Sequence, residues 1–206
     1  MLLTDGYFRA LILCRKSRRG IWRLHYVFVL FLLLSVPQNY ALSQSFSRYD
    51  KHVAIIERWL GQTEDKGANR SKLIDSMNRY VGNPYGSPYC AATPCFALKI
   101  SGNAVFKTGL ARNLRNKDTF TAWDVITGKR QIMKGDLLVW QKGETINGHA
   151  AVASENWNDA SGETYEGNTS SGENGSQSNG NGFWARFRSI SPTSYFRIKW
   201  ITPLRA

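Results

Sequence analysis

The sequence contains few cysteines and few histidines, three of each among 206 residues. The cysteines are Cys14, Cys90 and Cys95, and the first lies in a segment that we expect to be removed. The other two are five positions apart on one expected helix, so their side chains point in different directions and no disulfide is expected. After that segment only His52 and His149 remain, and there is no Cys-x-x-Cys pair. The sequence therefore predicts no zinc site, and at least one thiol is free for chemistry.

Signatures of several other functions are also missing. There is no Gly-x-Ser-x-Gly motif and no phosphate-binding loop, which argues against a serine hydrolase of the α/β type and against a P-loop nucleotide hydrolase. No block of Lys and Arg with interleaved aromatic residues marks a nucleic-acid groove. We therefore expect no cofactor, no metal and no nucleic-acid partner.

The charge is unevenly distributed. The formal net charge is +12, and six of the 27 basic residues and one of the 15 acidic residues lie before Ser43, so the remainder carries +7. A basic surface of this kind suits a polyanion such as nucleic acid, anionic lipid or a cell-wall polymer, and the charge alone does not choose among them. Hydrophobic residues make up 42% of the chain, which indicates a globular fold.

The first 43 residues have the pattern of a secretory signal peptide. A basic cluster at 15–19 precedes an apolar run at 26–36, and small residues follow at 41–43. As a helix the apolar run spans about 16 Å, well short of the roughly 30 Å hydrocarbon core of a bilayer. We expect cleavage, no stable membrane span afterwards and a secreted or periplasmic bacterial protein; the alternative is an uncleaved membrane anchor. Residues 44–206 then form one domain.

Helical patterns come first in this domain. A first helix is expected over 44–61, with His52 as a surface or partly packed residue. Ser71 can cap a second helix that ends at Gly82. The third helix is expected from about Cys90 to Ile100, and a short helical patch follows at 120–126.

Strand-like stretches follow the helices. They alternate polar and apolar residues or form short apolar runs, as strands do. The expected strands are 136–140, 149–153, a third that starts at 164, 183–188 and 195–200. This order predicts an α+β fold, with N-terminal helices packed on a C-terminal antiparallel β-sheet.

The most informative stretch surrounds Cys90. A turn-rich segment of Gly, Pro, Asn and Ser ends there, and an Ala-rich helical run begins. The N–H groups of a first helical turn have no partner within the helix, and the dipole is positive at that end, so both favour a thiolate. Pro94 is tolerated only near the first turn, which places the helix start close to Cys90. Cys90 is therefore a candidate nucleophile, and Cys95 is interpreted as a small buried apolar residue.

A cysteine nucleophile needs a base and a group that orients this base. His149 opens an apolar strand, and Glu166 and Asn168 lie at the end of the next strand. Neighbouring antiparallel strands bring the end of one within reach of the start of the other. Either Glu166 or Asn168 could therefore accept a hydrogen bond from the second ring nitrogen of His149.

Four motifs in this order resemble the CHAP family of cysteine, histidine-dependent amidohydrolases and peptidases. They are Gly-x-Pro-Tyr-Cys-Ala-Ala at 86–92, Lys-Gly-Asp-Leu at 134–137, Gly-His-Ala-Ala-Val at 148–152 and Glu-Gly-Asn-Thr at 166–169. The resemblance covers roughly residues 66 to 188. It implies a papain-like fold and hydrolysis of amide bonds in bacterial peptidoglycan, as an N-acetylmuramoyl-L-alanine amidase or a peptide endopeptidase.

The resemblance also implies roles for single residues. Cys90 corresponds to the nucleophile, His149 to the base, Glu166 to the orienting group and Asn168 to an accessory polar group. The sequence departs from the family at Tyr89, where Trp is frequent, at Thr93-Pro94-Cys95, and in a long polar loop after Asn168.

These departures leave two alternatives to a peptidoglycan hydrolase. One is an inactive secreted module that binds cell wall on the same scaffold. The other is a papain-like amidase that acts on an amide outside the wall.

Overall fold

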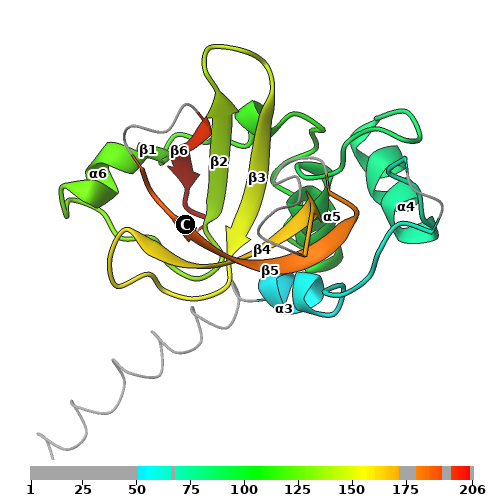
Figure 1. Ribbon diagram of the computed structural model, residues 1–206, viewed down its shortest axis with the longest axis horizontal. Coiled ribbons are helices and arrows are strands. Elements are labelled where there is room, and N and C mark those ends of the chain that lie inside the picture. Colours follow the sequence, from blue (N-terminus) through cyan, green and yellow to red (C-terminus); the bar gives the residue numbers. More distant parts are fainter. Residues whose placement is uncertain (1–50, 66–67, 172–179, 192–195, 205–206) are drawn as a thin grey trace, which may run out of the picture. The chain divides into compact units, whose positions relative to one another are not determined.

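The computed structural model describes residues 51–65, 68–171, 180–191 and 196–204 (Figure 1). The predicted signal segment at 1–43 lies outside these residues. The helical elements of the described part are α3 (Lys51–Glu57), α4 (Lys72–Val81), α5 (Ala92–Ile100), the 3-10 turn η1 (Ala111–Asn113) and α6 (Ala122–Ile126). None of these helices has the length and apolar character needed to cross a bilayer.

Helix α4 has the ends that its sequence predicts. The Ser71 hydroxyl accepts a hydrogen bond from the Ile74 N–H at 3.2 Å, which satisfies one of the unpaired amides of the first turn. Gly82 ends the helix in the left-handed conformation, with φ +83°, which a residue without a Cβ adopts at little cost. Both signals are local, so the prediction for this helix is confirmed.

The first predicted helix is too long at its C-terminal end. Helix α3 ends at Glu57, whereas the prediction continued to Gly61. The chain turns after α3, and the Gly61 N–H donates to the Phe183 carbonyl at 2.9 Å. Tight turns, such as the one closed by the Trp59 N–H and the Ile56 carbonyl, and the bond to Phe183 therefore replace the last helical turn. The predicted residues 44–50 lie outside the described part.

The expectation for His52 was wrong. Its side chain is buried, and Nε2 donates to the carbonyl of Gly135 at 2.9 Å. This bond ties α3 to the turn before strand β2, so His52 has a structural role.

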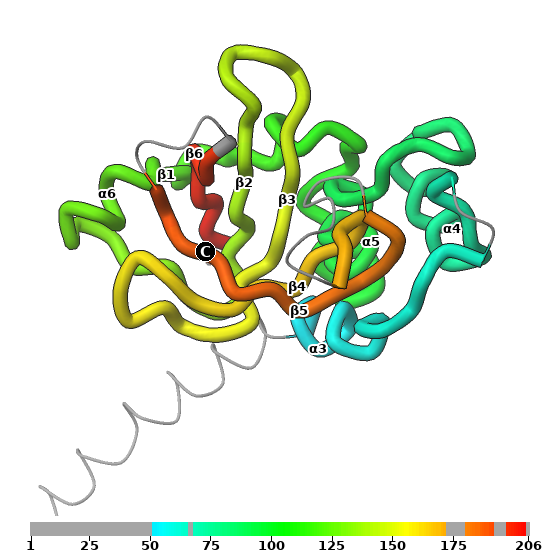
Figure 2. The backbone as a smooth tube through the Cα atoms, viewed as in Figure 1, coloured from blue at the N-terminus to red at the C-terminus, as the bar shows by residue number. Residues whose placement is uncertain are grey.

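Six antiparallel strands form one sheet, and the α+β class is confirmed. They are β1 (Phe120–Thr121), β2 (Leu137–Lys142), β3 (Gly148–Ala153), β4 (Ser161–Thr169), β5 (Gly182–Ser189) and β6 (Phe196–Thr202). The order across the sheet is β1-β6-β2-β3-β4-β5. Strands β2 and β3 form one hairpin and β4 and β5 a second (Figure 2). The two-residue strand β1 was not predicted.

The register decides which side chains share a face of the sheet. His149 lies opposite Trp140, and Glu166 lies opposite Trp184. Val152 lies opposite Tyr165, so these two side chains share one face of the sheet. Because side chains alternate along each strand, His149 and Glu166 both project from the opposite face, which also carries Trp140.

Each face of the sheet contributes to its own apolar cluster. One cluster combines residues of α3, α4 and α5 with Leu137, Val139, Ala150 and Val152 of β2 and β3. The other contains Trp140, Trp157 and Ile198 together with Val125 of α6. The strands that carry the candidate site residues are therefore held on both sides by buried apolar contacts.

Candidate active site

Cys90 lies in the turn that starts helix α5. The Thr93 N–H donates to the Tyr89 carbonyl at 2.9 Å, which closes the first helical turn around the cysteine. The first residue assigned to the helix is Ala92, two positions after the predicted start, and Pro94 is the third. The Cys90 side chain is buried at 5% exposure, so few solvent molecules reach the thiol.

His149 is held by Glu166. The ring is buried, and Nε2 lies 2.9 Å from Oε2 of Glu166. Of the two acceptors that the sequence left open, the Glu166 carboxylate is therefore the partner of Nε2. Nδ1 is also buried; it interacts with the Cys90 side chain, although no hydrogen bond of standard geometry reaches it in the described part of the chain.

The environment makes His149 a strong base. Burial lowers the pKa of the imidazole, but the Glu166 charge and hydrogen bonds with Cys90 and Glu166 outweigh burial and raise the pKa to about 9. The interaction with Cys90 shows that the thiol lies next to the ring. The structure thus brings Cys90, His149 and Glu166 together.

Glu166 is fully buried and accepts hydrogen bonds from three other side-chain groups. The Arg188 Nε and Nη2 atoms donate to its two oxygens at 2.6 Å each, and the Thr164 hydroxyl donates to Oε1 at 2.8 Å. Burial raises the pKa of Glu166, but hydrogen bonds with Arg188 and the charges of His149 and Arg188 lower it to about 2. The carboxylate is therefore ionised at neutral pH.

Sequence reasoning missed Arg188 and Trp140. The guanidinium of Arg188 lies 5.7 Å from the centre of the Trp140 ring, and the same ring lies 5.6 Å from that of His149. Alternation in strand β5 places Arg186 and Arg188 on one face, and a buried Glu166 needs a cation. These signals point to an arginine, but they do not identify it without the register between β4 and β5.

Asn168 occupies an irregular position in β4. Its φ is +61°, and the pairing shifts register between Gly167 and Thr169. The Asn168 side chain is buried. The backbone carbonyl of Asn168 accepts a hydrogen bond from the Gly180 N–H at 3.0 Å, and its backbone also interacts with the Tyr89 hydroxyl. The bulge therefore lies beside the segment that carries Cys90.

Gly167 allows β4 to approach helix α5. A Cβ at this position would lie 2.2 Å from Oγ1 of Thr93, a distance that atoms do not tolerate. The Glu-Gly-Asn sequence thus serves packing as well as chemistry, because a side chain at 167 would push the strand from the helix.

Cys95 contrasts with Cys90. Both cysteines are free, as predicted. The Cys95 side chain has no exposed surface, its Sγ lies 3.5 Å from the Thr108 carbonyl, and burial raises the pKa of this thiol to about 11. It is therefore a buried packing residue.

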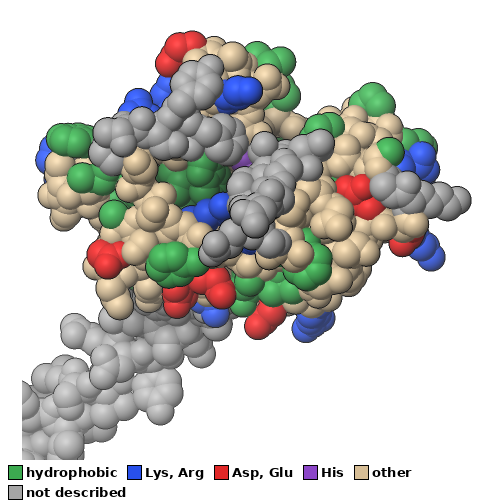
Figure 3. All heavy atoms as spheres, in the orientation of Figure 1, with side chains coloured by type: hydrophobic (Ala, Val, Ile, Leu, Met, Phe, Trp, Pro, Cys, Tyr) green, Lys and Arg blue, Asp and Glu red, His purple; other side chains and the backbone are tan. Residues whose placement is uncertain are grey.

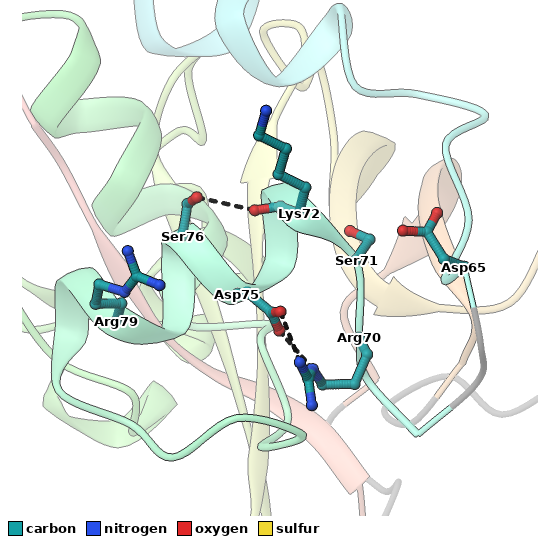
Figure 4. A pocket seen from close by; sticks show the side chains of 7 residues that line it. All are labelled: Asp65, Arg70, Ser71, Lys72, Asp75, Ser76 and Arg79. Atoms are coloured by element: carbon teal, nitrogen blue, oxygen red, sulfur yellow. Dashed lines mark hydrogen bonds and ion pairs between the residues drawn. The ribbon is translucent and has the colours of Figure 1, made fainter.

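No other candidate centre stands out in the described part of the chain. It contains no group of three or more His, Cys, Asp or Glu side chains that could hold a metal. A hollow beside α4 is lined by seven residues, and its Arg70 and Asp75 side chains point toward each other and form an ion pair at 2.7 Å (Figure 4). Its lining contains no cysteine and no histidine.

Charged side chains are dispersed over the face shown in Figure 3. Lysine and arginine lie among aspartate and glutamate there, and they do not gather into one basic patch. The visible basic side chains of the described residues therefore do not mark one binding surface on this face.

Comparison of the chain with protein-family models, with curated proteins and with solved structures found no match. The function is therefore argued from the residues and geometry of the site.

Proposed function

We propose that the protein is a cysteine hydrolase that cleaves amide bonds, with Cys90 as nucleophile and His149 as base. The observation that carries this proposal is a buried imidazole with one nitrogen on the Glu166 carboxylate and the thiol of a helix start beside it. A nucleophile, its base and a group that orients the base are the three parts that such catalysis requires.

The first half of the reaction forms a thioester. In the resting site His149 already holds the proton drawn from the Cys90 thiol, because its pKa lies at about 9, and the sulfur attacks the carbonyl carbon of the substrate amide. Backbone N–H groups at the start of α5 stabilise the oxyanion, and each such donor contributes about 2.7–4 kcal/mol in other enzymes. The intermediate collapses, the C–N bond breaks, and protonated His149 gives its proton to the leaving amine.

The second half releases the acid. His149, now neutral, takes a proton from water, and the resulting hydroxide attacks the thioester carbonyl. The C–S bond breaks and the proton returns to sulfur, which leaves a carboxylic acid and free Cys90. Proton transfer by a positioned histidine accelerates such steps by about 10²–10⁴-fold.

The resemblance to CHAP enzymes supports peptidoglycan as the substrate and a papain-like arrangement as the fold. The pattern at 1–43 supports export of a bacterial protein, so that the enzyme reaches the wall. The positive net charge supports attraction to an anionic cell-wall polymer.

The proposal is tested by incubating the protein with purified peptidoglycan and identifying the products by mass spectrometry. Wild type and Cys95→Ala are expected to release new amine ends, and Cys90→Ala is expected to release none. Cys95→Ala is the matched control, because it removes the other buried free thiol, which lies on α5. A free muramic lactyl carboxylate identifies an amidase, and a cleaved peptide identifies an endopeptidase.

Equal product release by wild type and Cys90→Ala would overturn the proposal. Intact wall with wild type would overturn peptidoglycan as the substrate. In that case, rapid alkylation of Cys90 supports an amidase for another bond, and slow alkylation supports an inactive module.

A further inference from the structure

We propose that Arg188 is a positioning residue that keeps Glu166 ionised and fixed throughout the reaction, including the stage at which His149 is neutral. This inference rests on the proposed function. It adds a fourth member to the site, on strand β5, that the chemistry of the nucleophile and base does not itself require.

The contact between Arg188 and Glu166 has the geometry of a strong pair. Nε lies 2.6 Å from Oε1 and Nη2 lies 2.6 Å from Oε2, so each carboxylate oxygen receives one N–H. Paired bonds of this kind fix the orientation of a carboxylate as well as its charge. The Arg188 side chain is 15% exposed and that of Glu166 is fully buried, so water screens the pair little.

The register explains how the two side chains meet. Glu166 lies opposite Trp184 and Arg188 lies opposite Gly162, so both project from one face at different points along the β4–β5 hairpin. Thr164 lies between them on this face, and its hydroxyl donates to Oε1. The arginine therefore reaches along the sheet to the carboxylate and does not face it directly.

The reaction creates a need for this second cation. In the resting site His149 and Arg188 both compensate the buried Glu166 charge. After His149 gives its proton to the leaving amine, Glu166 faces a neutral ring. A buried carboxylate without a partner takes up a proton, and it would then no longer accept a hydrogen bond in the same way. Arg188 prevents this change, because its guanidinium stays charged.

Trp140 covers the pair. Its indole is 7% exposed and lies near both the His149 ring and the Arg188 guanidinium. Apolar cover lowers the local dielectric and strengthens the interaction between Arg188 and Glu166.

The other groups that act on Glu166 come from two elements. Strand β3 contributes His149, which itself interacts with Cys90, and strand β4 contributes the uncharged Thr164. Arg186, two positions before Arg188, donates instead to the Ser170 and Ser171 carbonyls at 2.9 Å each. Arg186→Met is therefore a matched control on the same strand.

The test is the rate of Cys90 alkylation by iodoacetamide as a function of pH, read by peptide mass mapping on the full chain. In Arg188→Met, Glu166 takes up its proton at higher pH, so the rate is expected to fall on the acid side about 1–3 pH units earlier than in wild type. Arg188→Lys keeps the charge with a single donor group and is expected to recover part of the shift. Arg186→Met should follow the wild-type profile.

Unfolding of each variant is measured in parallel. If Arg188 has only a structural role, Arg188→Met is less stable, but the folded variant keeps the wild-type fall of the Cys90 alkylation rate at acid pH. That result overturns the proposal. Alkylation needs no substrate, so the two proposals are tested separately. A shift of the acid limb supports the positioning role of Arg188 even when the wall stays intact, and the absence of a shift overturns this role even when the wall is cut. If Arg188→Met does not fold, Arg188→Lys is used in its place: a smaller shift of the acid limb supports the proposal, and no shift overturns it.

Discussion

Replacing Glu166 by glutamine tests the charge balance of the buried site, because it keeps the shape of the side chain and removes its charge. The pKa of His149 lies at about 9 against an ordinary value of 6.5. At 1.36 kcal/mol for each unit, this difference favours the imidazolium by about 3 kcal/mol. With the carboxylate gone, its charge no longer opposes burial, and we expect the pKa of His149 to fall well below 9 in Glu166→Gln.

The same change leaves Arg188 without its counter-ion. Removing one partner of a buried ion pair costs about 3–5 kcal/mol, and the 15% exposure of Arg188 places the expected loss near the lower end. We therefore expect the unfolding free energy of Glu166→Gln at pH 7 to be about 3 kcal/mol lower than that of wild type.

The pH dependence of this loss has a defined window. The raised pKa of His149 contributes stability that is complete below about 6.5 and is lost as the pH rises through about 9. The lowered pKa of Glu166 contributes stability that is present above 4.5 and is lost as the pH falls through about 2. The difference in unfolding free energy between wild type and Glu166→Gln is thus expected to be largest between about pH 4.5 and 6.5.

Histidine ring NMR and urea unfolding provide the measurements. The His149 resonance is assigned by its loss in His149→Asn, and the His52 ring, bonded to Gly135, serves as the reference. An unchanged His149 titration in Glu166→Gln, or an unfolding free energy equal to that of wild type, would refute the reasoning.

Three further predictions concern single contacts. Thr164→Val removes one hydrogen bond to a charged group and is expected to cost about 1.5–3 kcal/mol in urea unfolding, and no loss would contradict the bond. Gly167→Ala is expected to cost about 1–3 kcal/mol by overpacking against Thr93, and adding Thr93→Ala should recover part of it; a double variant no more stable than the single one argues against this contact. Cys95→Ala is expected to lose about 1 kcal/mol of stability and to keep wild-type hydrolysis, so inactivity of this variant would contradict its packing role.

Local signals predicted the parts of the fold that local interactions decide. Ser71 and Gly82 mark the ends of α4 because a capping hydroxyl and a left-handed glycine act within one turn. The Gly- and Pro-rich segment and Pro94 likewise placed Cys90 close to the start of α5, in the turn two residues before the first helical residue. The end of α3 was missed because the bond that replaces helical pairing comes from Phe183, far along the chain.

The site residues fall into the same two groups, those that local signals predict and those that depend on distant parts of the chain. The scarcity of histidine predicted His149, and the Glu-Gly-Asn motif predicted Glu166 as one of two acceptors. The places of Arg188 and Trp140 in the site depend on the register of four strands, β2 to β5, and one residue of slippage would turn each side chain to the other face. Alternation in sequence shows which residues share a face, but it does not show how far along the neighbouring strand they lie.

The position of β5 at the edge of the sheet bears on how the proposed active site is lost. Residues 61–64 pair with the start of β5 through bonds to Asn181 and Phe183, whereas Arg188 lies toward the other end of this strand. Edge segments exchange their amide hydrogens through local opening, at a free energy below that of global unfolding. Opening of this end, which breaks the bond from the Ile190 N–H to the Ala160 carbonyl, would carry Arg188 away while His149 and Cys90 stay in place. On heating, loss of the proposed hydrolysis is then expected to precede the loss of the fold.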